Sequence, residues 1–549
     1  MEKKRLLTLV GTCFLVLLLT ALPFMAACAT EKAEGKNILR IALFQNPSGL
    51  NAFMARGGND DSCCALVYET LWNQLLDGTI KPVLAKSWEY RAEDFTYIVH
   101  LDERAKFSDG EPVTADDVKF TFDTQFKYDF PAGSRVKPFV RSVEVIDAHT
   151  VNFKLTEPIG SFVPNVSGVY IVPKHIWSKI QDPAMYDNPN PLGSGPFLFK
   201  EYKPNAYFYA VANKDYWRCP VQIDGVMMMI YLNPEAAVLA LRKGEIDAVS
   251  DLMGLYSLVP TLLAEGIQVF VDKNTNSPCN IMINHRRYPN NIKEFRQAVS
   301  IAIDRKLIIE QAMRGYAMPP QMCPIAPSVT KWVNPKAAWP GWDMTEEDRI
   351  SKANAMLDEL GFKRGADGIR VTPEGKRLEF ELLIGAFPSH QNAAAIVKID
   401  MEKIGIKITL KIAESFFAIV WCEKPDFDWA LSDWGGGKPA DPDYLVSEYG
   451  ADPPNPWFDS CAQGWENDEI QGMLRQSRRE TDETKRWELI QKVQEGFAEE
   501  LPSIILYHPL LVGAYRTDRF EGWSPTGMFC LEGVWALSSI ETIMSLRPK

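Results

Sequence analysis

The stretch RLEFELLIGAFPSHQNAAAIVKIDMEKIGIKITLKIA, residues 377–413, decides the fold class. Apolar and polar side chains alternate from Leu378 to Leu382 and again from Ile406 to Ile412, the pattern of strands with one buried face. Between these segments, apolar residues from Ala394 to Met401 recur at helical spacing. A strand, a helix and a strand in this order predict a parallel βαβ unit with a right-handed crossover. The sequence therefore predicts an α/β fold.

Three other stretches predict helices with recognisable ends. Asn233 suits the N-cap of one helix, and Gly244 ends it. An apolar stripe predicts a second helix from about 291 to Gly315. A third helix is expected to begin after Thr481 as its N-cap and to end before Pro502.

Length and composition indicate a folded protein of more than one lobe. The chain has 549 residues, too many for one ordinary core, and it is 46% hydrophobic and 24% charged. Its formal net charge of -12 argues against nucleic acid as a partner, because nucleic-acid binding requires a basic face.

The N-terminal segment is typical of an export signal. Three cations precede an apolar run from Leu6 to about Leu22, and Pro23 follows. The run is marginal for a membrane-spanning helix, which needs about 20 apolar residues, and the proline would interrupt such a helix. We therefore expect an exported protein.

Small residues at 26–27 precede Cys28, and this end of the leader resembles the lipobox of bacterial lipoproteins, with Met25 in place of leucine. The resemblance implies that residues 1–27 are removed and that the Cys28 thiol is acylated. The lipid would anchor the chain at the outer face of the cytoplasmic membrane or in the periplasm, with residues 28–36 as a polar tether. An ordinary cleaved signal with a chance cysteine is the alternative.

The cysteines give no metal signature. No CxxC motif occurs, so a zinc site is not expected, and we predict no metal and no cofactor. Export makes disulfides feasible, and buried free thiols are the equal alternative. Beyond Cys28 the cysteines are Cys63, Cys64, Cys219, Cys279, Cys323, Cys422, Cys461 and Cys530.

Six blocks in a fixed order carry a family resemblance. Together they resemble the family 5 extracellular solute-binding proteins, which serve ABC importers of oligopeptides, dipeptides, nickel chelates and some oligosaccharides. The resemblance extends from about Leu39 to beyond Tyr515. The blocks are YETLWNQLLDGTIKPVLAKSWEY (68–90), FSDGEPVTADDVKFTFD (107–123), NPLGSGPFLFKEY (190–202), LRKGEIDAV (241–249), FRQAVSIAIDRKLI (295–308) and LPSIILYHP (501–509).

The resemblance implies a two-lobed fold of the periplasmic-binding-protein type II-like class, with an extra subdomain inserted in lobe I. The chain should cross between the lobes near 279–284 and near 505–509, where a few backbone angles would absorb closure. By analogy, lobe I takes residues 37–66, 196–278 and 509–549, the inserted subdomain takes 67–195, and lobe II takes 279–508.

The segment PDFDWALSDWGGGKPADPDYLVSEYG, residues 425–450, is the first candidate for the ligand site. In peptide-binding relatives a tryptophan at the place of Trp434 lines the cleft, and an aspartate three residues later pairs with the peptide amine. Here that position is Gly437, and Asp441 is the candidate replacement. A buried ammonium without a partner costs several kcal/mol, so a site lacking this carboxylate favours a neutral ligand such as an oligosaccharide. Trp429 is expected to pack in the core.

Strand ends supply further ligand-binding candidates. Phe44 and Gln45 follow the first predicted strand, where α/β proteins tend to bind ligands. Phe387 and His390 follow the strand that ends near residue 384. Each of these residues serves equally well as a loop anchor.

Catalytic signatures are missing from the sequence. It contains no HExxH motif, no GxSxG elbow and no P-loop lysine, so we predict a binding protein and not an enzyme. The resemblance implies an ABC permease and ATPase complex as partner, an oligopeptide as the default ligand, and a monomer. An oligosaccharide and a metal chelate are the alternative ligands, and a sensor or scaffold receptor is the alternative role.

Overall fold

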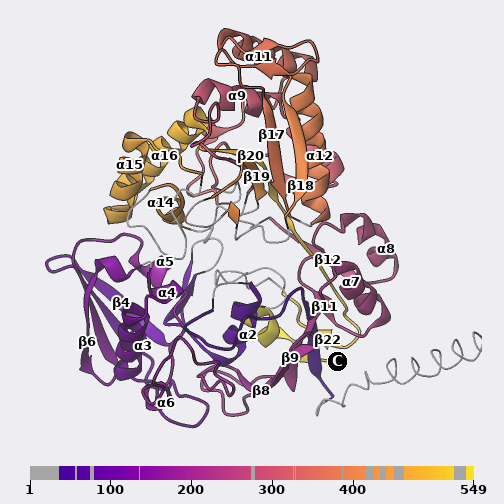
Figure 1. The fold of residues 1–549 in the computed structure, drawn as a ribbon. Coiled ribbons are helices and arrows are strands. Elements are labelled where there is room, and N and C mark those ends of the chain that lie inside the picture. Colours follow the sequence, from indigo (N-terminus) through magenta and orange to yellow (C-terminus); the bar gives the residue numbers. More distant parts are fainter. Residues whose placement is uncertain are drawn as a thin grey trace, which may run out of the picture.

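A computed structural model of the chain shows two lobes, each built on its own sheet (Figure 1). The lobe with the seven-stranded sheet is called lobe I, and the lobe with the six-stranded sheet is called lobe II. The structure describes residues 36–55, 58–74, 79–134, 136–273, 278–325, 327, 329–385, 387–413, 419–420, 425–432, 441–450, 463–524 and 539–549.

Lobe I contains a mixed sheet in the order β12-β21-β11-β1-β10-β9-β8. The central strand β1 is parallel to both neighbours, β10 and β11, and the outer pairs are antiparallel. The strands are β1 Ile38–Leu43, β8 Phe197–Lys203, β9 Tyr207–Ala212, β10 Gly225–Ile230, β11 Ala248–Val249, β12 Gln268–Asp272 and β21 Leu511–Tyr515.

Lobe II contains a second mixed sheet in the order β14-β20-β13-β19-β17-β18. The pairs β17–β18 and β17–β19 are parallel, and the other pairs are antiparallel. The strands are β13 Cys279–Ile283, β14 Ala317–Met318, β17 Glu379–Ile384, β18 Lys407–Ile412, β19 Trp429–Ser432 and β20 Ser503–Pro509.

A separate antiparallel sheet, β4-β5-β7-β6, lies between β3 and β8 along the chain and is called the insert. It forms the lower left of Figure 1, with helix α3 beside it. Its strands are β4 Ala85–Arg91, β5 Thr96–Leu101, β6 Val140–Asp147 and β7 Thr150–Leu155; the short hairpin β2 Trp72–Gln74 and β3 Ile80–Pro82 precedes them.

Helices cover the sheets on several sides (Figure 1). In chain order they are α2 Gly58–Val67, α3 Ala115–Lys127, α4 Pro131–Ser134, α5 Phe162–Val166, α6 Lys174–Trp177, α7 Pro234–Lys243, α8 Val259–Ala264, α9 Lys293–Ala302, α10 Arg305–Leu307, α11 Glu346–Glu359, α12 Pro388–Lys403, α14 Tyr444–Tyr449, α15 Asp468–Arg479, α16 Glu483–Glu500 and α17 Ile540–Ser545. The C-terminal residues form β22 Phe520–Glu521 and β23 Arg547–Pro548.

The predicted βαβ unit is confirmed as β17, α12 and β18, with β17 and β18 parallel. Leu382 pairs in register with Leu410, and Leu382 is fully buried. The prediction of one buried face is wrong at the end of β17, because Leu383 is also buried and packs in a small cluster with Met282 and Ala430. The second face of this sheet is therefore covered as well.

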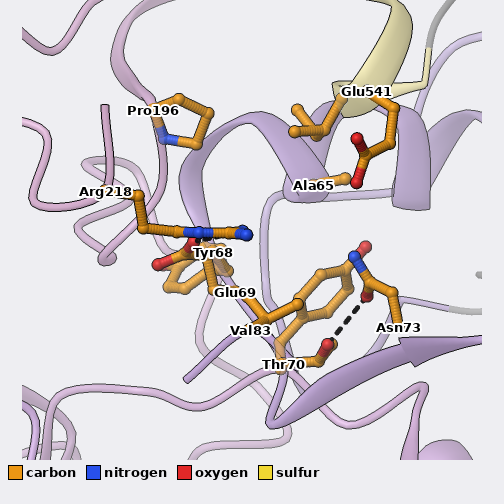
Figure 2. A pocket seen from close by; sticks show the side chains of 11 residues that line it. Ala65, Tyr68, Glu69, Thr70, Asn73, Val83, Pro196, Arg218 and Glu541 are labelled. Atoms are coloured by element: carbon orange, nitrogen blue, oxygen red, sulfur yellow. Dashed lines mark hydrogen bonds and ion pairs between the residues drawn. The ribbon is translucent and has the colours of Figure 1, made fainter. Parts of the chain in front are cut away.

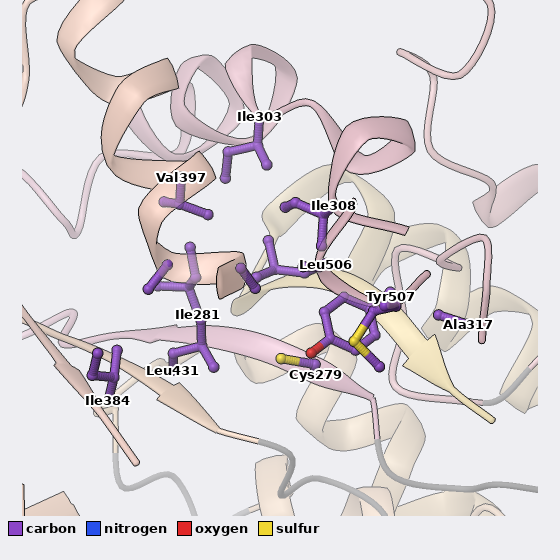
Figure 3. Close-up of a cluster of buried hydrophobic side chains, with 14 of the residues drawn as sticks. Cys279, Ile281, Ile303, Ile308, Ala317, Ile384, Val397, Leu431, Leu506 and Tyr507 are labelled. Atoms are coloured by element: carbon purple, nitrogen blue, oxygen red, sulfur yellow. The ribbon is translucent and has the colours of Figure 1, made fainter. Parts of the chain in front are cut away.

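The core of lobe II lies between its sheet and helices α9 and α12 (Figure 3). Ile281, Leu431 and Leu506 come from three neighbouring strands, and Val397 of α12 and Ile303 pack on them. Each buried Leu, Ile or Val side chain contributes about 1.5–3 kcal/mol relative to an exposed one. This packing makes the lobe a rigid support for residues at the strand ends.

Two of the three predicted helices need correction. Helix α7 is confirmed: the Asn233 side chain accepts the Ala236 N–H, and Gly244 ends the helix at a φ of 75°. The helix expected from 291 to 315 is broken after Ala302, because Ile303 is extended at φ -67° and ψ 127°. The N-cap of α16 is Asp482 and not Thr481.

The chain passes between the two sheets at two adjacent places. β12 ends at Asp272 in lobe I, and β13 begins at Cys279 in lobe II. β20 ends at Pro509 in lobe II, and β21 begins at Leu511 in lobe I. Asp272 and Leu511 are register partners, so the end of β12 lies beside the start of β21. Both passages lie just outside the predicted segments 279–284 and 505–509, because those residues are largely strands of lobe II.

Candidate functional site between the two lobes

The carboxyl ends of the parallel strands indicate where a ligand site is expected. In lobe I, β1 ends at Leu43, next to β10 and β11. In lobe II, Ser432 at the end of β19 is paired with Asn280 at the start of β13, directly after the chain has crossed from lobe I. Ligands of α/β proteins bind at such strand ends, so the ends of these strands form the candidate site.

Phe44 and Gln45 lie at the lobe I edge of this site. Phe44 is half-buried and packs on the core cluster that includes residues of both lobes, whereas Gln45 is exposed. The Tyr231 N–H donates to the carbonyl oxygen of Leu43 at 2.7 Å, which fixes the backbone just before Phe44. An aromatic and an amide side chain therefore follow directly after the end of β1.

Phe387 and His390 lie at the lobe II edge. Phe387 is the N-cap residue of α12 and is 46% exposed, whereas His390 is buried, and their rings meet edge to face at 5.5 Å. A Cβ atom on Gly254 of lobe I would lie 3.2 Å from the backbone nitrogen of Ser389. The start of α12 therefore contacts lobe I, so these two residues lie close to the lobe interface.

Trp434 and Gly437 lie outside the described residues. The strand that precedes them in the sequence is β19. Trp429 in that strand is fully buried, donates from Nε1 to Asn290 Oδ1 at 3.1 Å and stacks on Phe380 at 5.0 Å. Trp429 is therefore a core residue, as expected.

Asp441 is buried and has an internal partner. Its two carboxylate oxygens accept hydrogen bonds from Nη1 and Nη2 of Arg486 at 2.8 and 2.5 Å, and Asp441 and Arg486 are 7% and 6% exposed. Burial lowers the pKa of Arg486, but Asp441 together with the nearby carboxylates of Asp443 and Glu483 outweighs this effect, and the pKa is raised. In this conformation both carboxylate oxygens of Asp441 are bonded to a buried guanidinium.

Asp443, two residues later, connects lobe II to the insert. It accepts hydrogen bonds from Ser161 Oγ and Asn165 Nδ2, both at 2.8 Å, and from Arg478 Nε at 2.9 Å. Burial acts to raise the pKa of this carboxyl, but Arg478, Arg486 and the Asn165 hydrogen bond together outweigh burial and hold the pKa well below its usual range. Sequence reasoning missed this network, because Ser161 is 282 residues from Asp443 and no local pattern marks the pair.

The lobes also meet beside the crossing. The rings of Tyr256 and Tyr316 lie 5.1 Å apart, and the Leu510 N–H donates to the Tyr316 carbonyl oxygen at 3.0 Å. The two lobes thus contact each other both beside the crossing and at the insert. A ligand held between them is shielded from water, which strengthens every polar contact that it makes.

A small cavity elsewhere is not the ligand site. It lies in lobe I beside Glu69, with Arg218 reaching across it (Figure 2). Glu69 accepts hydrogen bonds from Tyr216 Oη at 2.7 Å and Trp217 Nε1 at 2.8 Å, and burial raises its pKa. The cavity volume of about 30 Å³ suits a water molecule and not a peptide or sugar.

Metal ligands are not clustered in the described part of the chain, where no group of three or more His, Cys, Asp or Glu side chains is placed to hold an ion. Cys63, Cys64 and Cys323 are buried free thiols. Among the described helices, none has the length and apolar character to cross a bilayer.

Residues 79–456 match the bacterial extracellular solute-binding proteins, family 5 (middle region). The oligopeptide-binding protein AppA of Bacillus subtilis (strain 168) is 25% identical over 512 residues, which cover 88% of this chain and 91% of AppA. The di/tripeptide-binding protein 4 of Pseudomonas aeruginosa (strain UCBPP-PA14) is 25% identical over 540 residues, which cover 91% of this chain and 94% of that protein.

Solved structures share the fold. A periplasmic oligopeptide-binding protein of an oligopeptide ABC transporter from Thermotoga maritima superposes with a TM-score of 0.83 at 25% identity, covering 94% of this chain and all of that one. The same protein bound to mannohexaose superposes with a TM-score of 0.79 at 24% identity and the same coverage.

Proposed function

The chain belongs to the family 5 bacterial extracellular solute-binding proteins, and from this membership we propose that it captures an oligopeptide between its two lobes and delivers it to an ABC importer. As a solute-binding protein of this family it acts outside the cytoplasm and is not an enzyme. The observation that carries the proposal is the family match over residues 79–456, joined by relatives named for peptide binding that align along 88–91% of this chain.

The proposed ligand contacts come from segments that follow strands of both lobes. They are Phe44 and Gln45 from lobe I, and Phe387 and His390 from the start of α12, with Trp434 and Gly437 following β19 in the sequence. Aromatic side chains supply apolar contact area. The Gln45 and His390 side chains supply hydrogen bonds to the ligand backbone, which is the same in peptides of any sequence. Such a site suits a ligand whose recognised part is its backbone.

Asp441 is the least supported of the predicted contacts. To bind a peptide amine, its carboxylate would have to leave Arg486, and breaking a buried ion pair costs about 3–5 kcal/mol. We therefore propose that the ligand amine, if it is bound, pairs with a different group.

An oligosaccharide is the second candidate ligand. The family resemblance implies that Gly437 takes the place of the amine-binding aspartate of peptide-binding relatives, and a protein similar in fold has been solved with mannohexaose. A neutral sugar needs no buried anion and stacks on aromatic rings.

A thermal-shift screen of the soluble chain from residue 29 tests these alternatives with di- to hexapeptides, oligosaccharides and nickel chelates. A ligand at one hundred times its Kd adds about 2.7 kcal/mol of stability. We expect stabilisation by peptides. Stabilisation by sugars alone would overturn the peptide proposal, and a peptide that still binds after N-terminal acetylation would show that no carboxylate anchor is needed.

We also propose that Cys28 carries the lipid anchor, since the residues before it resemble a lipobox. Cells that express the chain should incorporate labelled palmitate into it, and Cys28→Ala should abolish the label. A Cys28→Ala chain that is still labelled would contradict the anchor site.

A further inference from the structure

We propose that the loop Gly160–Ser161 and helix α5 of the insert form a latch with Asp443 and Arg478 of lobe II, and that this latch stabilises the closed form without touching the ligand. Figure 1 shows α5 directly below α14 and α15. The inference rests on the proposed function only in one respect: closure is taken to serve ligand binding.

The lobe II half of the latch is held by hydrogen bonds within lobe II. Arg478 holds Asp443 through Nε at 2.9 Å and Nη2 at 3.0 Å. The Asp443 N–H donates to Asp441 Oδ1 at 2.9 Å, and Asp441 is itself held by Arg486. Arg486 in turn donates from Nε to the Ser477 carbonyl oxygen at 3.0 Å. The carboxylate of Asp443 is thus presented in a fixed direction by contacts within lobe II alone.

The insert half is also held by its own lobe. The Tyr97 hydroxyl donates to the Ile159 carbonyl oxygen at 3.2 Å, and Trp72 Nε1 donates to the Val163 carbonyl oxygen at 2.7 Å. Phe162 is fully buried in the insert core. The donors of Ser161 and Asn165 therefore meet Asp443 as two preformed surfaces, so little ordering entropy is lost on contact.

The backbones of the two lobes touch at Gly160. Its N–H donates to the Arg478 carbonyl oxygen at 2.9 Å. A Cβ atom at this position would lie closer than 3.0 Å to the Glu480 carbonyl oxygen, so only glycine permits the contact. The φ of Gly160 lies outside the left-handed region, so alanine fits the same backbone when the lobes are apart. Gly160→Ala should therefore destabilise the contact between the lobes and leave the fold of the insert unchanged.

The buried latch differs from the exposed ion pair at the edge of the same interface. Arg479 and Glu157 form an ion pair across the same interface at 2.7 Å, but both side chains are about one-third exposed. Exposed pairs contribute little, whereas Asp443 and Asn165 are 4% and 8% exposed and exclude water. Most of the free energy that the interface contributes to closure therefore comes from the contacts of the buried Asp443 carboxylate.

The first test is Gly160→Ala, with Gly472→Ala in α15 as the matched control, because a Cβ on Gly472 meets nothing within 4 Å. We expect Gly160→Ala to weaken binding of the peptide found in the thermal-shift screen by about tenfold or more and to enlarge the radius of gyration measured by small-angle X-ray scattering with that peptide present. Gly472→Ala should change neither quantity.

The second test is Asn165→Asp, which keeps the side-chain size and sets a second carboxylate against Asp443. Ser447→Ala is its control, because Ser447 Oγ accepts from Arg478 Nη2 at 3.3 Å within lobe II and makes no bond to the insert. Hydrogen exchange at the Gly160 amide reports the latch with or without ligand. We expect Asn165→Asp to speed this exchange at least tenfold and Ser447→Ala to leave it within twofold.

The outcomes separate the latch from the peptide proposal. If Gly160→Ala and Asn165→Asp leave exchange, size and affinity unchanged, the latch is wrong. It is also wrong if the Gly160 amide of the unmodified chain exchanges freely under every condition. If no peptide binds but Asn165→Asp still speeds exchange at Gly160, the latch stands and the peptide proposal falls.

Discussion

Replacing Asp441 by asparagine distinguishes a structural carboxylate from a ligand anchor. The substitution keeps the shape of the side chain but removes the charge that faces Arg486, whose guanidinium is almost fully buried. Removing one partner of a buried ion pair costs about 3–5 kcal/mol, and we expect the lower end because asparagine keeps one acceptor for Arg486. In a lobe of roughly 200 residues, about 3 kcal/mol lowers the Tm by about 6–12 °C.

Calorimetry and urea unfolding measure this loss, and a ligand titration at 25 °C completes the assay. The control is Asp518→Asn, which makes the same change in an exposed pair with Arg516 and should cost at most about 1 kcal/mol. Because asparagine also keeps the Oδ1 acceptor for the Asp443 N–H, the latch is preserved, and we expect Asp441→Asn to bind ligand with unchanged affinity wherever it is folded. A variant of normal stability that has lost peptide binding would refute the structural role and restore Asp441 as the amine anchor.

Three further perturbations test the fold. Gly513→Ala should prevent stable folding of lobe I, because a Cβ there would overlap Phe270 and a backbone carbonyl oxygen; a normal urea midpoint would contradict the sheet packing. Asn233→Ala should cost about 1 kcal/mol in urea unfolding by removing the cap of α7, whereas Asn233→Ser should restore most of it. Burial lowers the pKa of His508 from 6.5 to about 3, and that of His285 likewise, so the unfolded state binds more protons between these values. Stability should therefore fall as the pH drops from about 6.5 to 3, and His508→Leu should flatten that fall in urea midpoints measured across the range.

Local patterns in the sequence predicted the elements that depend on local physics. The β17–α12–β18 unit follows from side-chain periodicity within 377–413, and helix α7 follows from its own cap residues. These features depend on residues within or next to each element, so they can be predicted without knowing any partner distant in the sequence.

Distant partners explain what the sequence did not predict. The break at Ile303 accompanies a hydrogen bond from the Asp304 N–H to Asp400, 96 residues away, and this bond replaces continuation of the helix. The Asp443 network likewise joins residues 278 and 282 positions apart. From the sequence, Asp441 is the candidate carboxylate for the ligand amine. Its pairing with Arg486 is visible only in the folded chain.

Identification of the bound solute tests the central claim most directly. The chain, exported to the periplasm of a host grown in peptide-rich medium, is purified, and the ligand released by denaturation is identified by mass spectrometry. We predict one peptide per chain, variable in sequence. Release of a hexose oligomer, or a chain that carries no ligand and binds no peptide in calorimetry, would contradict capture of an oligopeptide.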